Sequence, residues 1–236
     1  TLPELPPYLE VLNTQTCNSH QTLPELPPSL ETLVVWSCIS LNLPELPPSI
    51  ETLDVEGCTS LQTLPEFPTF LKTLCVQECE SLRTLPWLPS TLETSNAKSC
   101  ISLQSLPELP PFIKALNVQE CKSLQILLEL PLFLSTLNVG ECKSLQTLPE
   151  LPLFLKALHA ENCKSIQTLP ELPPSLDTLI SQSCTSLKTL SELPLFFKTL
   201  NVQECESLQT LPKLPPSLET LNAESCTSLQ TLPELP

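Results

Sequence analysis

The cysteines are the residues of this sequence best suited to chemistry, and they return at a fixed spacing. Eleven of the twelve are 21 residues apart, with a single spacing of 20. The series consists of Cys17, Cys38, Cys58, Cys79, Cys100, Cys121, Cys142, Cys163, Cys184, Cys205 and Cys226. Such a series could form disulfides, bind metal ions, carry out redox chemistry, or fill one structural position in every unit of a repeat.

The spacing favours the structural position. Stacked copies of a repeat would bring equivalent Cα atoms to about 5 Å, but equivalent side chains point the same way and not at one another. A zinc site needs clustered ligands, such as a Cys-x₂-Cys pair with a second pair or with histidines, and the sequence has no such cluster. We therefore predict no metal and no cofactor. Each thiol is expected to turn inward after a strand and to bond weakly to the backbone of the adjacent turn. So many free thiols indicate a reducing, cytoplasmic setting.

No other group of residues indicates catalysis. Cys75 lies outside the series, at a position expected to face outward. His20 and His159 have no carboxylate or cysteine partner that the spacing singles out. A glycine-rich phosphate loop and a nucleophile elbow are both missing from the sequence. The chain is therefore predicted not to be an enzyme.

Composition narrows the classes of partner. The net charge of −15 argues against nucleic acid and against an anionic membrane surface. The apolar runs are far shorter than the roughly 18 residues that a transmembrane helix requires. The 28 prolines suggest disorder, but hydrophobic residues make up 41% of the chain and the prolines recur at fixed offsets. Because neither a signal peptide nor a methionine precedes Thr1, we expect the chain to be a piece of a longer protein.

The elements that position the cysteines belong to a repeated unit close to LPELPPSLETLNVQECKSLQT. We number its positions from the first leucine, so that the cysteine occupies unit position 16. The predicted domain is one array over 1–236, with a partial twelfth unit at 232–236. The eleven complete units are 2–22, 23–42, 43–63, 64–84, 85–105, 106–126, 127–147, 148–168, 169–189, 190–210 and 211–231.

The pattern within the unit predicts its local structure. The stretch L-x-V alternates apolar and polar residues, which is typical of a short, half-buried strand. The proline-rich LPELPPS stretch cannot be helical and is expected to return in an extended or polyproline conformation. Stacking of the units would give a parallel sheet on the concave face of an open arc, with little or no α-helix. Thr14, Ser95 and Ser181 place hydroxyls at expected core positions, so local opening is predicted to be easiest near Ser95 and Ser181.

The pattern L-x-x-L-x-V-x-x-C-x-x-L resembles the leucine-rich repeat signature over essentially the whole chain. Within that family, Cys followed by C-x-x-L, as in CKSL and CTSL, is similar to the C-terminal repeats of plant nucleotide-binding immune receptors of the Toll/interleukin-receptor class. Secreted effectors of Gram-negative pathogens, some of them ubiquitin ligases, have similar units with Asn in place of Cys. We favour the plant interpretation. A recently duplicated array without a selected ligand is a third hypothesis, because the units are nearly identical.

The resemblance implies a protein-recognition or regulatory domain used in plant defence. Its partner would be a pathogen effector or another domain of the same receptor, and its ligand surface would be the concave face. Most outward positions carry Asn and Gln, but one patch differs, because an aromatic residue lies beside an aliphatic one and near carboxylates. The predicted protein-binding residues are Val34, Trp36, Asp54, Glu56, Cys75 and Gln77. Trp36 could instead pack against a preceding part of the chain.

A column of glutamates at unit position 3 is the remaining regular charged feature. The column includes Glu108, Glu129 and Glu150, and Trp87 and Lys213 interrupt it. The stacked like charges either form a solvated face or provide an acidic strip for a basic partner.

Overall fold

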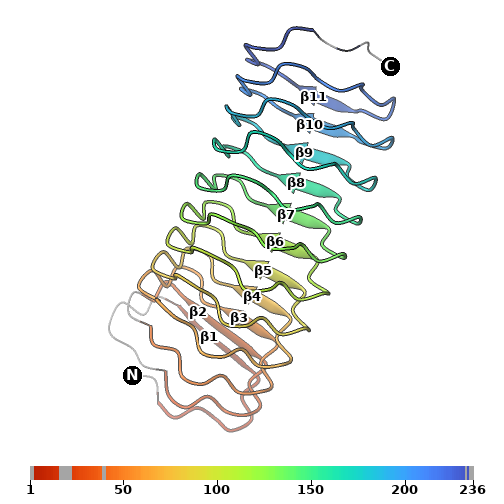
Figure 1. Cartoon of the computed structure of the whole chain (residues 1–236). Helices are drawn as coiled ribbons and strands as arrows, with labels where there is room; N and C mark the ends of the chain where they lie inside the picture. The colour runs from red at the N-terminus through yellow and green to blue at the C-terminus, as the bar shows by residue number, and fades with distance from the viewer. Residues whose placement is uncertain (1–2, 16–22, 39–40, 232, 234–236) are drawn as a thin grey trace.

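The computed structural model describes residues 3–15, 23–38, 41–231 and 233. Within them the chain forms one 11-stranded parallel sheet whose strands follow one another in sequence order, and the rungs stack along one axis (Figure 1). The strands are β1 (Val11–Gln15), β2 (Thr32–Trp36), β3 (Thr52–Asp54), β4 (Thr73–Cys75), β5 (Thr94–Asn96), β6 (Ala115–Asn117), β7 (Thr136–Asn138), β8 (Ala157–His159), β9 (Thr178–Ile180), β10 (Thr199–Asn201) and β11 (Thr220–Asn222).

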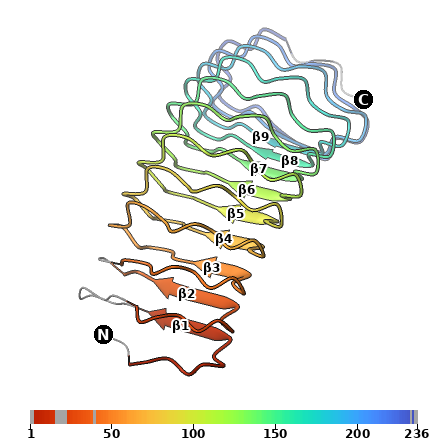
Figure 2. The same cartoon turned by 60° about the horizontal axis from the view of Figure 1, so that its bottom comes forward.

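The strands pair at equivalent unit positions, as the side-by-side arrows in Figure 2 show. In the β6–β7 pair, for example, Leu116 lies opposite Leu137 and Asn117 lies opposite Asn138. In the short strands from β3 to β10 the middle residue is buried, and in β6 and β7 its two neighbours are partly exposed. This alternation follows from the two-residue period of a strand, so the short-strand prediction is confirmed.

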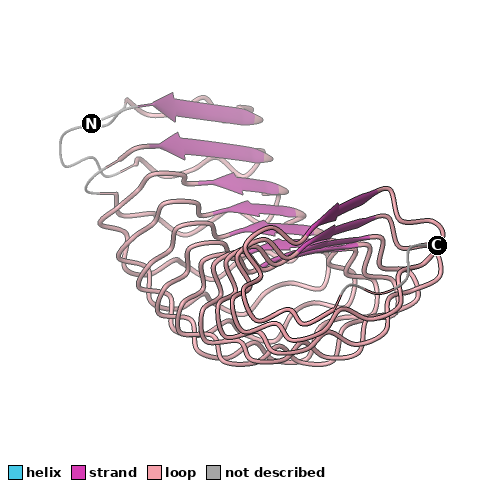
Figure 3. Cartoon of the chain, turned by 90° about the horizontal axis from the view of Figure 1, so that it is seen from above, coloured by secondary structure: helices cyan, strands magenta, loops and turns pink. Residues whose placement is uncertain are grey.

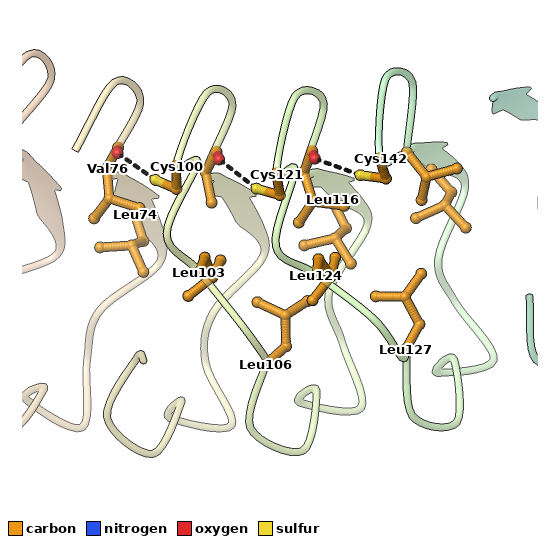
Figure 4. Close-up of a cluster of buried hydrophobic side chains, with 14 of the residues drawn as sticks. Leu74, Val76, Cys100, Leu103, Leu106, Leu116, Cys121, Leu124, Leu127 and Cys142 are labelled. Carbon is orange, nitrogen blue, oxygen red and sulfur yellow. Dashed lines mark hydrogen bonds between the residues drawn. The ribbon is translucent and has the colours of Figure 1, made fainter. Parts of the chain in front are cut away.

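The core consists of columns of equivalent side chains that run the length of the stack. Figure 4 shows Leu116, Cys121, Leu124 and Leu127 of neighbouring units pointing into the same interior. All four are buried. A three-residue strand cannot bury an apolar face alone, so each rung is stabilised by the leucines of the rungs above and below it.

The return segments are extended and complete the solenoid, and no helix occurs among the described residues (Figure 3). A tight turn leads each return segment into its strand: the amide of Leu134 donates to the carbonyl of Pro131 at 3.1 Å. The predicted fold class, a leucine-rich-repeat type of solenoid with a parallel sheet and almost no helix, is thus confirmed. The described part of the chain also has no helix that is long and apolar enough to cross a membrane.

A left-handed turn immediately precedes the cysteine, and the sequence alone does not predict it. The residue at unit position 15 has a positive φ in every described case, 62° at Glu120 and 57° at Asn162, for example. Glycine occupies this position once, at Gly57, with φ 73°. Left-handed backbone costs about 1–2 kcal/mol for a residue with a Cβ atom. Hydrogen bonding between rungs offsets this cost, because the Glu120 amide donates to the carbonyl of Gly140 at 2.8 Å.

Glu120→Gly is expected to raise the free energy of unfolding by about 0.5–1 kcal/mol. Glycine removes the steric cost of the left-handed turn but loses more backbone entropy on folding. Glu206→Gly is the matched control, because Glu206 is exposed and does not have a positive φ. The control should lower stability by about 0.5–1 kcal/mol. Urea titrations of both variants measure the difference, and a loss of stability in Glu120→Gly would contradict the assignment.

Candidate functional site

The cysteine series forms a structural column, as predicted. From Cys58 to Cys226, each thiol donates a hydrogen bond to a backbone carbonyl of the preceding unit, at Sγ–O distances of 2.9 to 3.3 Å. Figure 4 shows three of these bonds, including the one from Cys121 to the carbonyl of Ala97. Cys75 and the described series from Cys79 to Cys226 are free thiols. Cys17 and His20 lie outside the described residues.

Burial makes the column chemically inert. It raises the pKa of Cys100, Cys142 and Cys163 to about 12. Burial is also the main cause that raises the pKa of Cys184 and Cys205 to about 12. At neutral pH these groups are thiols and not thiolates, which are the reactive and metal-binding form. These buried, protonated thiols therefore support the fold.

The surface open to a ligand is the outer face of the sheet, which we call the sheet face. Its dominant residue is the asparagine at unit position 12, the last strand residue. In five units the Asn Oδ1 accepts the backbone amide two residues later; for Asn117 the donor is Gln119, at 3.0 Å. This local hydrogen bond fixes the side chain and closes the turn after the strand. The sequence suggested a surface role for these asparagines and missed the structural one.

Fixing Oδ1 leaves the Nδ2 group of each asparagine on the sheet face. Asn96 Nδ2 donates to Gln77 Oε1 at 3.0 Å, and Asn222 Nδ2 donates to Gln203 Oε1 at 3.1 Å. These bonds join one rung to the next. The face thus presents amide groups whose orientation is set before any ligand arrives.

The predicted patch lies at the N-terminal end of this face, on β2 to β4. Val34 and Trp36 are partly buried residues of β2, so the tryptophan is less exposed than the sequence suggested. Its indole Nε1 is buried and has no acceptor among the described residues. From Glu56 onward, unit position 14 lies in the turn after the strand and not in the strand itself. The three-residue strands end before this position is reached.

The structure brings four of the predicted residues together. The ligand atoms of Asp54, Glu56 and Cys75 all lie within 4.8 Å of one another, and Gln77 Nε2 donates to Glu56 Oε1 at 3.0 Å. Three such groups could in principle contact one cation. Burial first, and then the charges of Asp54 and Glu78, raise the pKa of the Glu56 carboxyl.

Cys75 is not an activated thiol. Burial raises its pKa to about 12, the nearby Asp54 and Glu56 carboxylates add to the rise, and a hydrogen bond from the Gln77 backbone opposes it. Cys75 thus occupies the asparagine position, and its sulfur accepts the amide that an asparagine Oδ1 accepts elsewhere. The thiol is a poor nucleophile at neutral pH.

A second feature of the sheet face was not predicted. His159 Nδ1 lies 3.6 Å from Glu161 Oε1, so His159 does have a carboxylate neighbour, because the turn after β8 folds Glu161 back toward it. Burial alone would raise the pKa of Glu161, but hydrogen bonding and charge from His159 outweigh it and lower that pKa. Gly140 makes room for Glu161, since a Cβ atom there would lie 2.7 Å from Glu161 Oε2.

A shallow hollow adjoins this pair. It has a volume of about 330 Å³ and its lining includes Thr94, Ser95, Ala115, Asn138 and His159. The small residues Thr94, Ala115 and Thr136 line it at unit position 10.

Comparison with known proteins gives structural neighbours only. No protein-family model and no curated protein matches this sequence. YopM from Yersinia enterocolitica WA-314 is similar in structure, with 28% identity and a TM-score of 0.57 over 100% of this chain and 59% of that one. A leucine-rich repeat protein from Bacteroides ovatus ATCC 8483 has 19% identity and a TM-score of 0.55 over 90% of this chain and 60% of that one. The chain thus spans about three fifths of either protein.

Proposed function

We propose, on the premise that this chain is a leucine-rich-repeat solenoid, that it is a protein-recognition module whose sheet face binds another protein. A solenoid of this type is typically a non-enzymatic scaffold for protein interaction. One observation carries the proposal: the asparagine amides of the sheet face are held in place by the turns beneath them. Preorganised donors lose little conformational entropy on binding, so they favour a specific complex.

The patch on β2 to β4 gives this proposed surface a chemical preference. Asp54 and Glu56 carry negative charge beside the half-buried Trp36, and Gln77 extends the patch into the next rung. An aromatic ring beside carboxylates suits a basic side chain of the partner, whose aliphatic stem can lie on the indole. The proposed contact residues are therefore Val34, Trp36, Asp54, Glu56, Cys75 and Gln77.

Two biological settings are proposed for the module. The C-x-x-L form of the repeat supports the repeat region of a plant intracellular immune receptor, in the cytoplasm, where an effector or another receptor domain would bind one of two receptor states more tightly. The likeness to YopM supports a bacterial effector instead. The flanking reading frame distinguishes the two: a nucleotide-binding domain upstream favours the receptor, and a ligase domain downstream favours the effector.

Trp36→Ala is expected to weaken binding to the cognate partner by about tenfold, because a partly buried tryptophan in a contact patch is a typical hot spot. The measurement is a titration of the purified chain against the neighbouring domains of its own reading frame and against candidate effectors. Trp87→Ala is the matched control, since Trp87 is exposed at unit position 3 of a return segment. Equal affinities of the two variants would remove the patch from the binding surface.

A further inference from the structure

The turn that leads into each strand keeps the same backbone hydrogen bond, but its side-chain contacts depend on the residue at unit position 7. Where that residue is Ser or Thr, its hydroxyl donates to carbonyls of the preceding unit. Ser175 Oγ, for example, lies 2.5 Å from the carbonyl oxygen of Leu153 and 2.8 Å from that of Leu155, and Ser217 lies 2.8 Å from two such oxygens. In these units, hydrogen bonds connect the turn to the preceding unit.

Three consecutive units replace this hydroxyl by phenylalanine. Phe112, Phe133 and Phe154 stack on one another, with ring centroids 6.1 and 5.8 Å apart. Leu132 and Leu153 precede the last two rings at unit position 6. All five side chains are about half exposed, from 47% at Phe133 to 59% at Leu153. We call these five residues the phenylalanine ladder.

The phenylalanine ladder contributes little to the stability of the folded chain. The same chain shows that Ser or Thr at unit position 7 makes hydrogen bonds to the backbone, whereas the phenylalanines leave large apolar surfaces in water. A contiguous exposed apolar patch on a folded protein is typical of an interaction site. The ladder is therefore better explained by a partner than by the core.

The spacing of the rings suits an α-helix lying along the stack. Residues i and i+4 of a helix are separated by a rise of about 6 Å, close to the observed centroid spacings of 6.1 and 5.8 Å. A helix with one apolar side chain per turn could place one of these side chains against each of the three rungs. A groove of about 310 Å³, lined by Pro111, Leu132 and Phe133, lies between the first two rungs and could receive one of these side chains.

The charges beside the ladder determine the kind of helix. Glu129 lines the same groove, and Glu108 and Glu150 hold the equivalent position in the neighbouring units. All three are exposed, and none of the ion pairs among the described residues involves them. On the strand side, Lys114 is already paired with Glu93 at 2.5 Å, while Lys156 is exposed and is in none of the ion pairs among the described residues. The unneutralised charge on the return-segment flank of the ladder is therefore negative, with three carboxylates against the single Lys156 on the strand flank.

We propose that the phenylalanine ladder binds an amphipathic helix of a partner protein, with its apolar face on the rings and its Lys or Arg residues against Glu108, Glu129 and Glu150. This surface is separate from the sheet face, so the two binding functions stand or fall independently. The mode is that of a helix held on an apolar surface and oriented by one charged flank.

The test uses two fluorescent helical peptides of about 18 residues, long enough to be helical in isolation. Both carry leucine at i, i+4, i+7 and i+11; one has lysines along one flank and the other has glutamates there. Fluorescence anisotropy is expected to show saturable binding of the basic peptide, at least about tenfold tighter than the acidic one at low salt. Replacing Glu108, Glu129 and Glu150 by Gln should abolish this preference.

The matched variants are serine substitutions, because serine is the residue that this chain itself uses at unit position 7. The triple variant with Phe112→Ser, Phe133→Ser and Phe154→Ser should keep the fold, as measured by circular dichroism. Its affinity for the basic peptide should be at least about tenfold lower. Phe196→Ser is the control, since Phe196 is exposed but lies between Ser175 and Ser217 of the adjacent units. It should leave binding unchanged.

Several results would overturn the proposal. These are a basic peptide that does not bind saturably, a triple variant that binds it as tightly as the parent chain, or equal affinities for the two peptides. Sedimentation that shows a dimer dissolved by the triple variant, with no competition from the peptide, would assign the ladder to a second copy instead. Co-sedimentation with phosphatidylcholine vesicles that depends on the three rings would assign it to a lipid surface.

Discussion

Raising the pH of the reduced chain from 8 to about 10.5 is expected to unfold it. Burial raises the pKa of the cysteine column far above the value of about 8.5 that a thiol has in an unfolded chain. For Cys100, Cys142, Cys163, Cys184 and Cys205 the folded value is about 12. Burial raises the pKa of Cys79 and Cys121 as well.

The sign follows from proton binding. Between pH 8.5 and 12 the unfolded chain has lost the thiol protons and the folded chain still holds them, so stability falls as the pH rises. Below about pH 8.5 the protonated thiols contribute their full stabilisation. Above it, each thiol lowers the free energy of unfolding by about 1.4 kcal/mol per pH unit, so five thiols lower it by roughly 7 kcal/mol per unit. A domain is typically stable by only about 5–15 kcal/mol, so the unfolding midpoint should lie below about pH 10.5.

The measurement is the free energy of unfolding from urea titrations at pH 8, 8.5, 9 and 9.5 in the presence of a reductant. Cys142→Ala should be less stable at pH 8, but its slope against pH should be smaller by about 1.4 kcal/mol per unit. Tyr8→Phe controls for the one tyrosine of the chain, which is exposed, and should not alter the slope. A stability that stays constant from pH 8 to 9.5 would show that the thiols are not held protonated by burial.

Ser95→Leu is expected to stabilise the chain by about 3 kcal/mol. Ser95 lies between Leu74 and Leu116 in the sheet register and is 3% exposed. Its Oγ is buried and has no partner among the described residues, which costs about 1–3 kcal/mol. Leucine restores the residue of the neighbouring rungs, and burying its side chain contributes about 2–3 kcal/mol. Ser181→Val repairs the equivalent defect at Ser181, whose Oγ is also buried and unpartnered.

Hydrogen exchange resolves this prediction along the stack. In the parent chain the amides of β4 to β6 and of β9 should exchange faster than those of β7, because a solenoid opens locally at its weakest rungs. Ser95→Leu should slow exchange in β4 to β6 and leave β9 unchanged. Ser90→Leu is the matched control at an exposed position, with an expected change below about 0.5 kcal/mol. Uniform protection in the parent chain would contradict the argument.

The sequence by itself determined the architecture, the register and the core. A fixed period assigns every equivalent side chain to the same face of its rung, so the inward leucines and the cysteine column follow from spacing alone. The same period identified the buried hydroxyls of Ser95 and Ser181. It also brought Asp54, Glu56, Cys75 and Gln77 into one predicted patch, since neighbouring units lie about 5 Å apart.

Only the tertiary structure decided what happens at the turns. The left-handed residue before each described cysteine of the series is usually Glu or Ser and is glycine only at Gly57, and hydrogen bonds between rungs stabilise it. The asparagine that closes the turn after the strand is indistinguishable in sequence from one free to bind a ligand. In the run Leu132-Phe133-Leu134 all three residues are apolar, but only Leu134 is fully buried. The tight turn directs the first two outward, so backbone geometry and not hydrophobicity created the phenylalanine ladder.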